Sequence, residues 1–181
     1  MPLLSPDHRN LTFDPETANK YLELSKGARK AKHGASAVRG QEQGPRFQPW
    51  QVLCTQSYGP GRHYWEVKIS SHSVILGVTY RGLPWEQQRH RFNIGLDGGS
   101  WGLQVLEDCY LAWHKGQAEK IQEQLYKNLG VSLDYGKGLL SFYGLGERTK
   151  LIHSFHSVFT EPLYPVFWLC EGRVVTLCQR D

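Results

Sequence analysis

Hydrophobic and polar side chains alternate along most of the chain after Trp50. Short segments rich in Val, Ile, Leu, Tyr and Trp follow one another and are separated by clusters of Gly, Pro, Asp or Ser. A period of two is typical of β-strands, and the clusters between them are typical of turns. The pattern predicts strands at 51–55, 63–70, 74–80, 100–106, 110–114, 130–134, 139–143, 151–155, 164–169 and 174–178.

The order of these predicted strands indicates the fold class. No helices alternate with them, which favours antiparallel sheets packed face to face. We therefore predict an all-β fold, a two-layer antiparallel β-sandwich. Within 63–70, Tyr64 and Glu66 should point to one face and Trp65 and Val67 to the other, so Trp65 is predicted in the core. Trp101, Phe142, Tyr143 and Phe167 are assigned to folding in the same way.

Two segments depart from the strand pattern. Asp14-Pro15-Glu16-Thr17 has an acidic N-cap residue and a proline at the first helical position, which predicts a short N-terminal helix. In the segment 116–128, apolar residues recur at helical spacing, so this segment is either a short helix or an excursion from the sheet. We expect one domain over 11–181, preceded by a linker or the edge of a fragment at 1–10.

Composition narrows the class of protein. The 181 residues are 40% hydrophobic and 21% charged, values of a globular domain rather than of a disordered chain. No run approaches the roughly eighteen apolar residues of a membrane span, and the first residues lack the regions of a signal peptide. We expect a cytoplasmic protein that does not contact a membrane.

The residue types that carry chemistry are scattered. Cys54, Cys109, Cys170 and Cys178 have apolar neighbours and no zinc-finger spacing, which favours buried reduced thiols. His153 and His156 should point to opposite faces of a strand, which disfavours a shared metal. The chain contains no nucleophile elbow, P-loop, zincin or dinucleotide motif. We expect a non-catalytic domain with no cofactor and no metal.

Charge is concentrated in one segment. The formal net charge is +4, and the segment 26–46 contains six Lys or Arg residues, one Glu and several glycines, typical of a basic loop. Three interpretations stay open: a solvated surface, an electrostatic guide for an acidic protein partner, or an RNA contact. Because 26–46 contains no aromatic residue on which a base could stack, we favour a protein partner over RNA.

Four strings in order resemble the PRY-SPRY family. Gly61-Arg62-His63-Tyr64-Trp65-Glu66-Val67 resembles its G-x-H-Y-W-E-V signature, and Leu11-Thr12-Phe13-Asp14-Pro15-Glu16-Thr17-Ala18 resembles the L-x-x-D-P-x-T-A opening of the PRY segment. Gly130-Val131-Ser132-Leu133-Asp134-Tyr135, with Leu140-Ser141-Phe142-Tyr143, is similar to the core hairpin. Phe159-Thr160-Glu161-Pro162-Leu163-Tyr164-Pro165-Val166-Phe167 is similar to the stretch before the last strands. The resemblance places PRY at about 11–60 and SPRY at about 61–181.

The resemblance implies a role in protein recognition. Such domains most often end tripartite-motif (TRIM) E3 ubiquitin ligases, whose target they select. Ser100-Trp101 and Ala112-Trp113-His114 are most similar to TRIM proteins associated with antiviral RNA-sensor signalling, so an innate-immune RNA sensor is a candidate target. We expect a folded protein partner, oligomeric or filamentous, bound by a monomeric domain that a full-length coiled-coil dimer presents twice. RNA binding through 26–46 is the alternative.

The resemblance also implies where the partner binds. Matched onto known family complexes, the chain should form one binding face from its loops, the middle of the strand after Trp101 and the turn around Glu171. Trp85, in a loop of turn residues, is a candidate hot spot. Gln104 and Leu106 occupy positions where family members place aromatics, and Gly136-Lys137-Gly138 replaces an acidic turn. The expected contacts are Arg29, Lys32, Arg39, Arg46, Arg81, Trp85, Gln104, Leu106, Glu107, Lys115 and Glu171.

Overall fold

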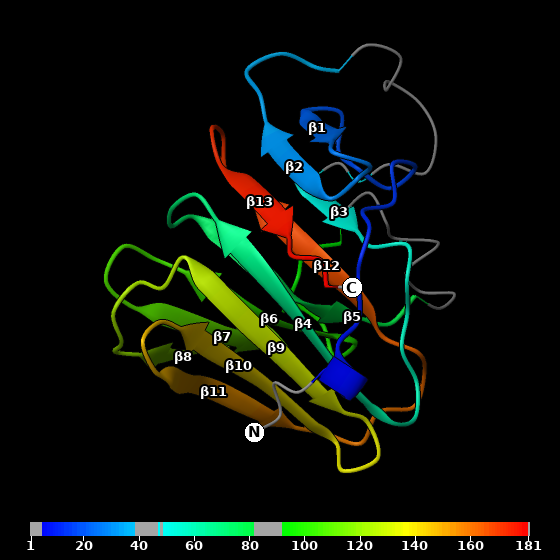
Figure 1. Cartoon of the computed structure of the whole chain (residues 1–181), viewed down its shortest axis with the longest axis vertical. Coiled ribbons are helices and arrows are strands. Elements are labelled where there is room, and N and C mark those ends of the chain that lie inside the picture. The colour runs from blue at the N-terminus through cyan, green and yellow to red at the C-terminus, as the bar shows by residue number, and fades with distance from the viewer. Residues whose placement is uncertain (1–4, 39–46, 48, 82–91, 181) are drawn as a thin grey trace.

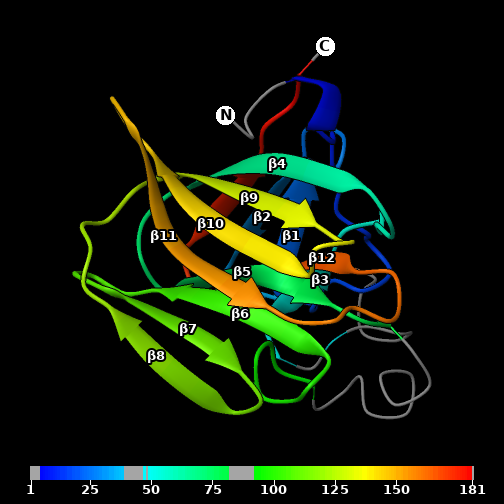
Figure 2. The same cartoon turned by 90° about the horizontal axis from the view of Figure 1, so that it is seen from below.

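Two antiparallel β-sheets lie face to face in the computed structural model, which describes residues 5–38, 47, 49–81 and 92–180. Figure 1 looks onto the seven-stranded sheet, ordered β1-β2-β13-β4-β9-β10-β11, with the six-stranded sheet, ordered β3-β12-β5-β6-β7-β8, behind it. Figure 2 shows the two layers from the side. The predicted all-β sandwich is confirmed.

The strands have the following bounds. The seven-stranded sheet contains β1 (Leu22–Ser25), β2 (Lys30–His33), β13 (Val174–Leu177), β4 (Arg62–Ile69), β9 (Asn128–Asp134), β10 (Leu139–Leu145) and β11 (Thr149–His156). The six-stranded sheet contains β3 (Gln51–Leu53), β12 (Tyr164–Leu169), β5 (Val74–Thr79), β6 (Ser100–Val105), β7 (Tyr110–His114) and β8 (Gln117–Ile121). Every strand predicted from the alternation is present, with bounds shifted by at most two residues.

The core lies between the sheets and follows the period of two. On β4, Trp65 and Val67 are fully buried in it, as predicted. Tyr64 points to the opposite face but is also buried, since the chain near His8 covers it. Burying each such side chain contributes about 1.5–3 kcal/mol, so the alternating residues supply most of the driving force for the fold. Tyr143, assigned to folding with the core residues, is only half-buried.

The predicted N-terminal helix is wrong. Residues 15–17 form a turn, in which the Asp14 carboxylate accepts a hydrogen bond from the Glu16 amide at 3.0 Å. The chain cannot continue as a helix because its next groups bond to β3: the Thr17 hydroxyl accepts from the Leu53 amide at 3.0 Å, and the Asn19 amide donates to the Gln51 carbonyl at 3.0 Å. Among the described residues, a single 3-10 turn at Ser5–Asp7 is the only helical element.

The segment 116–128 is not helical: its residues 117–121 form β8, the edge strand of the six-stranded sheet, and the rest leads to β9 of the other sheet. Lys115 and Gly116 have φ of 54° and 74°, the backbone of a two-residue hairpin turn that matches the twist of its strands. β8 then pairs with β7, with Ile121 opposite Tyr110. The helical spacing of the apolar residues was misleading because this turn, not side-chain periodicity, sets the local structure.

The first part of the basic segment, residues 26–33, is more regular than a loop. Lys26, Gly27 and Ala28 have positive φ and form the turn between β1 and β2. β2 pairs with β13 on its other side, so Lys32 lies on a sheet and not on a free loop. The first described residues pack beside the last: the Arg180 amide donates to Asn10 Oδ1 at 2.8 Å. No helix in the described part of the chain has the length and hydropathy needed to cross a bilayer.

Candidate functional site

The outer face of the six-stranded sheet carries a partly exposed apolar surface. We call it the outer-face patch: Ile75 of β5, Gln104 of β6, Leu111 and Trp113 of β7, and Trp168 of β12. The strand register places Trp168, Ile75, Gln104 and Leu111 in one row across four strands. Lys120 of β8 lies opposite Leu111, so a positive charge continues the row. Side chains from distant parts of the sequence thus form a single surface.

Trp113 is held in one orientation on this patch. Its indole N–H donates to Gln104 Oε1 at 2.8 Å. On the other side the chain passes close to it at Gly95, whose φ is +86°; a Cβ there would lie 2.4 Å from Trp113 Cβ. Only glycine fits this approach without strain. The tryptophan therefore presents a fixed surface, and a partner would lose little side-chain entropy in binding it.

Aromatic rings extend the patch toward the β1–β2 hairpin. Trp168 lies 5.9 Å from Trp50, Trp50 lies 4.4 Å from His33, and His33 stacks on Tyr21 at 5.7 Å between ring centroids. His33 itself is only 3% exposed, and its Nδ1 lies 2.9 Å from the Gly34 carbonyl. The rings connect the outer-face patch to the basic residues of the hairpin.

A second apolar cluster bounds the patch on its β3 side. Phe47, Phe92 and Ile94 pack there against Leu53 and Val166, and Ile75 and Trp168 contact this cluster. Phe47, Phe92 and Ile94 thus bury Leu53 of β3 and Val166 of β12, while Trp168 stays partly exposed. The exposed part is therefore centred on β5, β6 and β7.

The predicted contact residues do not form one group. Leu106 and Glu107 lie in the β6–β7 turn, at the same end of the sheet as Glu171. Ser73 connects the two turns: its amide donates to the Val105 carbonyl at 2.8 Å, and its carbonyl accepts from the Cys170 amide. Arg81 and Lys115 lie at the opposite end, beyond the paired residues Thr79 and Ser100. Gln104 lies between the two ends, within the outer-face patch.

The remaining predicted contacts are basic or lie outside the described residues. Arg29 and Lys32 are exposed on the β1–β2 hairpin. The Arg81 guanidinium lies 3.9 Å from the Asp14 carboxylate and 5.6 Å from the centre of the Tyr164 ring, so it also holds the turn at 15–17 against β12. Arg39, Arg46 and Trp85 fall outside the residues that the structure describes.

Sequence reasoning missed four members of the patch: Ile75, Leu111, Trp113 and Trp168. Alternation did contain a signal, because Tyr110 and Ala112 are buried and Leu111 and Trp113 must then point the other way. It could not show that this other face is open to solvent. Beside Gln104 the neighbouring strand supplies an aromatic ring, that of Trp113, whose indole N–H donates to the Gln104 side chain.

The described residues show no arrangement suited to catalysis at this surface. No member of the outer-face patch carries a titratable group. The strongest shifts fall on buried groups: burial raises the pKa of Tyr110 to about 12 and raises that of the Cys54 thiol. Within the described ranges, no three His, Cys, Asp or Glu residues are placed to hold a metal ion, and all four cysteines are free. The surface can bind by apolar contact, hydrogen bonding and charge.

Comparison with known proteins gives matches over most of the chain. The SPRY domain model matches residues 62–180, and the SPRY-associated domain model (PRY) matches residues 11–58. E3 ubiquitin-protein ligase TRIM65 of Mus musculus is 48% identical over 96% of this chain and 33% of its own length; the Homo sapiens protein is 46% identical over 96% and 34%. The crystal structure of the TRIM65 PSpry domain superposes with a TM-score of 0.90 at 45% identity, covering 97% of this chain and 92% of that one. The chain thus spans about a third of the curated relatives it matches.

Proposed function

Because this chain belongs to the PRY-SPRY family, we propose that it is the target-binding domain of a TRIM E3 ubiquitin ligase. PRY-SPRY domains are non-catalytic interaction modules, so ubiquitin transfer would belong to other domains of a longer chain. The similarity to TRIM65 of mouse and human supports this assignment. We place the protein in the cytoplasm, in keeping with its four free cysteines.

The outer-face patch is the observation that carries the proposal. Interfaces are dominated by a few anchors, among which tryptophan is enriched, surrounded by a polar rim. Trp113 and Trp168 provide such anchors, and Lys115 and Lys120 lie at the β7–β8 side of the same sheet. The partner that fits is a folded protein surface with an apolar centre and acidic residues beside it. Positive charge at the rim would speed association more than it would raise affinity.

The finer proposal concerns the identity of the target. We propose an innate-immune RNA sensor, engaged in its oligomeric or filamentous form. One domain would bind weakly, and a full-length coiled-coil dimer would present two copies. An artificially dimerised domain should then bind the assembled sensor more tightly than the monomer by a factor of roughly 10² to 10⁴. Surface plasmon resonance on the immobilised assembly measures this ratio, and equal affinities would contradict the bivalent part of the proposal.

Truncating the patch should abolish most binding. Trp113→Ala and Leu111→Ala should each weaken binding to a purified RNA sensor, assembled on RNA, by roughly tenfold or more, since each removes a central apolar contact. Leu151→Ala is the matched control, because Leu151 is 52% exposed on β11 of the other sheet and makes no part of the patch. Biolayer interferometry with all three variants measures the effect.

Comparing these variants distinguishes a wrong interface from a wrong target protein. If Leu111→Ala and Leu151→Ala weaken binding equally, the outer-face patch is not the interface. If no variant and no wild-type domain binds the sensor, the finer proposal is wrong, and affinity capture with the wild type and Trp113→Ala then identifies proteins whose recovery depends on the patch.

RNA is the second candidate, and one observation favours it. Tyr21 and Trp50, which lie outside the basic segment in sequence, flank His33 next to the β1–β2 hairpin. Aromatic rings beside exposed basic residues suit single-stranded RNA. RNA titrated at several salt concentrations tests this proposal. Saturable binding with an association constant whose logarithm falls linearly with the logarithm of the salt concentration would favour RNA. No saturable binding at low salt would rule RNA out.

A further inference from the structure

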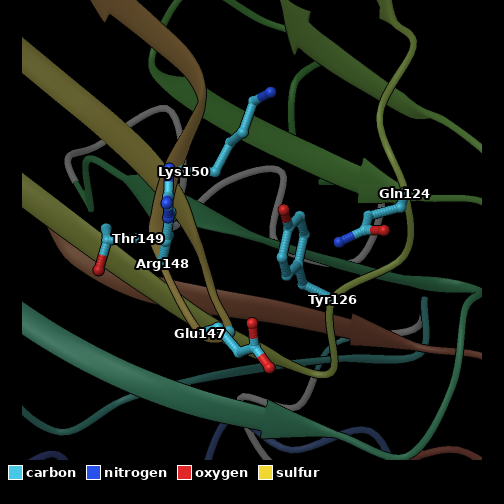
Figure 3. Close-up of a pocket in the computed structure, with 7 residues that line it drawn as sticks. Gln124, Tyr126, Glu147, Arg148, Thr149 and Lys150 are labelled. Atoms are coloured by element: carbon cyan, nitrogen blue, oxygen red, sulfur yellow. The ribbon is translucent and has the colours of Figure 1, made fainter.

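An open pocket of about 510 Å³ lies away from the outer-face patch, at the edge of the seven-stranded sheet. It is lined by the turn and first residues of the β10–β11 hairpin, 146–150, and by Gln124 and Tyr126 of the segment that connects β8 to β9. In Figure 3, Tyr126 stands between the chain that carries Gln124 and the hairpin that carries Arg148 and Lys150. A hairpin of the seven-stranded sheet and the segment that connects the two sheets therefore form one concave site.

The walls of this pocket are held in place by buried contacts. The Tyr110 hydroxyl, fully buried, donates to the Gln124 carbonyl at 2.8 Å and accepts from the Tyr126 amide at 2.9 Å. Gly144 lets the Tyr126 ring lie on the backbone of β10, since a Cβ there would come within 2.3 Å of the ring. An ion pair of 3.4 Å between Lys150 and Glu123 ties the hairpin to the connecting segment. The pocket is thus formed before any ligand arrives.

The polar groups of the pocket are mostly unused donors. The Arg148 guanidinium, the side-chain amide of Gln124 and the Tyr126 hydroxyl form no hydrogen bond or ion pair with any residue that the structure describes. Lys150 has one carboxylate neighbour and further N–H donors. A donor-rich site that includes an unpaired guanidinium is complementary to an oxyanion, which arginine can bind with two parallel hydrogen bonds.

The charge balance selects among oxyanions. Arg148 and Lys150 are opposed by Glu147 in the lining and by Glu123 on Lys150. The lining by itself carries one net positive charge, and Glu123 outside it brings the sum to zero, so the site suits a singly charged carboxylate better than a doubly charged phosphate. The Tyr126 ring adds an apolar surface for the methylene groups of an acidic side chain.

We propose that this pocket is a second docking site, which binds the side-chain carboxylate of an acidic residue on a protein partner. Arg148 holds the carboxylate, Gln124 and the Tyr126 hydroxyl donate to it, and Glu147 limits the pocket to a single negative charge. The site shares no residue with the outer-face patch, so it stands even if that patch has another role.

The test uses the isolated domain and short blocked peptides. Acetyl-Ala-Glu-Ala-amide, titrated into the ¹⁵N-labelled protein, should give saturable NMR shifts of Tyr126, Gly146 and Lys150, and acetyl-Ala-Gln-Ala-amide should give none. Arg148→Gln should lower the affinity for the Glu peptide by roughly tenfold or more, because a charge-assisted hydrogen bond is lost. Lys127→Gln, which removes the same charge from an exposed residue next to Tyr126 but outside the lining, should change the affinity less than twofold to threefold.

For a third variant, Glu147→Gln, we expect the opposite effect on affinity. It removes the negative charge that repels the ligand, so the Glu peptide should bind severalfold more tightly. Three results would overturn the proposal: no saturable shift up to the solubility limit of the peptide, equal weakening by Arg148→Gln and Lys127→Gln, or tighter binding of acetyl-Ala-phosphoserine-Ala-amide than of the Glu peptide. Thermal unfolding of each variant confirms that the exposed substitutions leave the fold intact.

Discussion

Gly77→Ala should destabilise the domain by about 3 kcal/mol or more, the size of effect expected when a buried backbone is forced apart. A Cβ at Gly77 would lie 1.9 Å from the Trp101 carbonyl oxygen and 2.8 Å from Gly102 Cα. Both atoms belong to the backbone of β6, and β5 is hydrogen-bonded to β12 on its other side. The strand cannot shift away without breaking one of these ladders.

The matched control is Gly136→Ala. Gly136 is exposed in the β9–β10 turn, where a Cβ would meet no atom within 4 Å, so the free energy of unfolding of Gly136→Ala should stay within a few tenths of a kcal/mol of the wild type. Equilibrium unfolding in urea, followed by circular dichroism, measures both. Similar midpoints for the two variants would mean that the close approach of β5 and β6 is not required.

Gly77 also matters for the candidate interface. It pairs with Gly102, and a Cβ on Gly102 would come within 2.6 Å of Ile94. Gly102 thus leaves room on the outer face for the Ile94 side chain, and the next residue, Gly95, lies against Trp113. A variant that folds with Ile94 and Gly95 displaced should also lose the binding attributed to the outer-face patch.

Trp101→Ala should lower the free energy of unfolding by about 3–5 kcal/mol, the range for removing a large aromatic side chain from a core. Trp101 is 2% exposed and stacks on His114 at 4.6 Å. It also meets Tyr80 and Phe159 edge-on, at 5.4 and 5.1 Å. The truncation leaves a cavity between the two sheets, and these neighbours come from separate elements that cannot all collapse into it.

Trp113→Ala is the internal comparison for this prediction. The two tryptophans lie on neighbouring strands but on opposite faces of the same sheet, and Trp113 is only partly buried. Its truncation should lower the free energy of unfolding by about 1–2 kcal/mol, because buried apolar area and the hydrogen bond to Gln104 are lost. Urea unfolding should therefore rank Trp101→Ala well below Trp113→Ala in stability. The reverse order would show that the inward and outward faces of β6 and β7 are assigned wrongly.

Parts of the fold were predictable because they depend on local chemistry. The strand at 63–70 was recognisable because Trp65 and Val67 alternate with polar residues, and a period of two has one structural meaning. The segment 117–121 was not recognisable, since all but one of its residues are exposed at the edge of the sheet and no buried alternation marks it. The helix expected after Asp14 failed for a different reason: its N-cap signal was real, but Thr17 and Asn19 bond to β3, far away in sequence.

The candidate site shows the same division more sharply. Gln104 was anticipated, but its partner Trp113 was not, because the hydrogen bond between them exists only when β6 and β7 pair in the observed register. The pocket at Arg148 and Tyr126 had no sequence signal, since its two walls are about twenty residues apart and meet only where the Tyr126 ring lies on Gly144 and Lys150 pairs with Glu123.

The sequence by itself determined the all-β class, the position of most strands, the core tryptophans and the family, since alternation and ordered motifs are local properties of the chain. Only the tertiary structure decided which face of the six-stranded sheet meets solvent and which loops share an end of the sandwich. The reason is geometric: alternation tells which residues point the same way, but sheet pairing across long separations determines what lies in front of them.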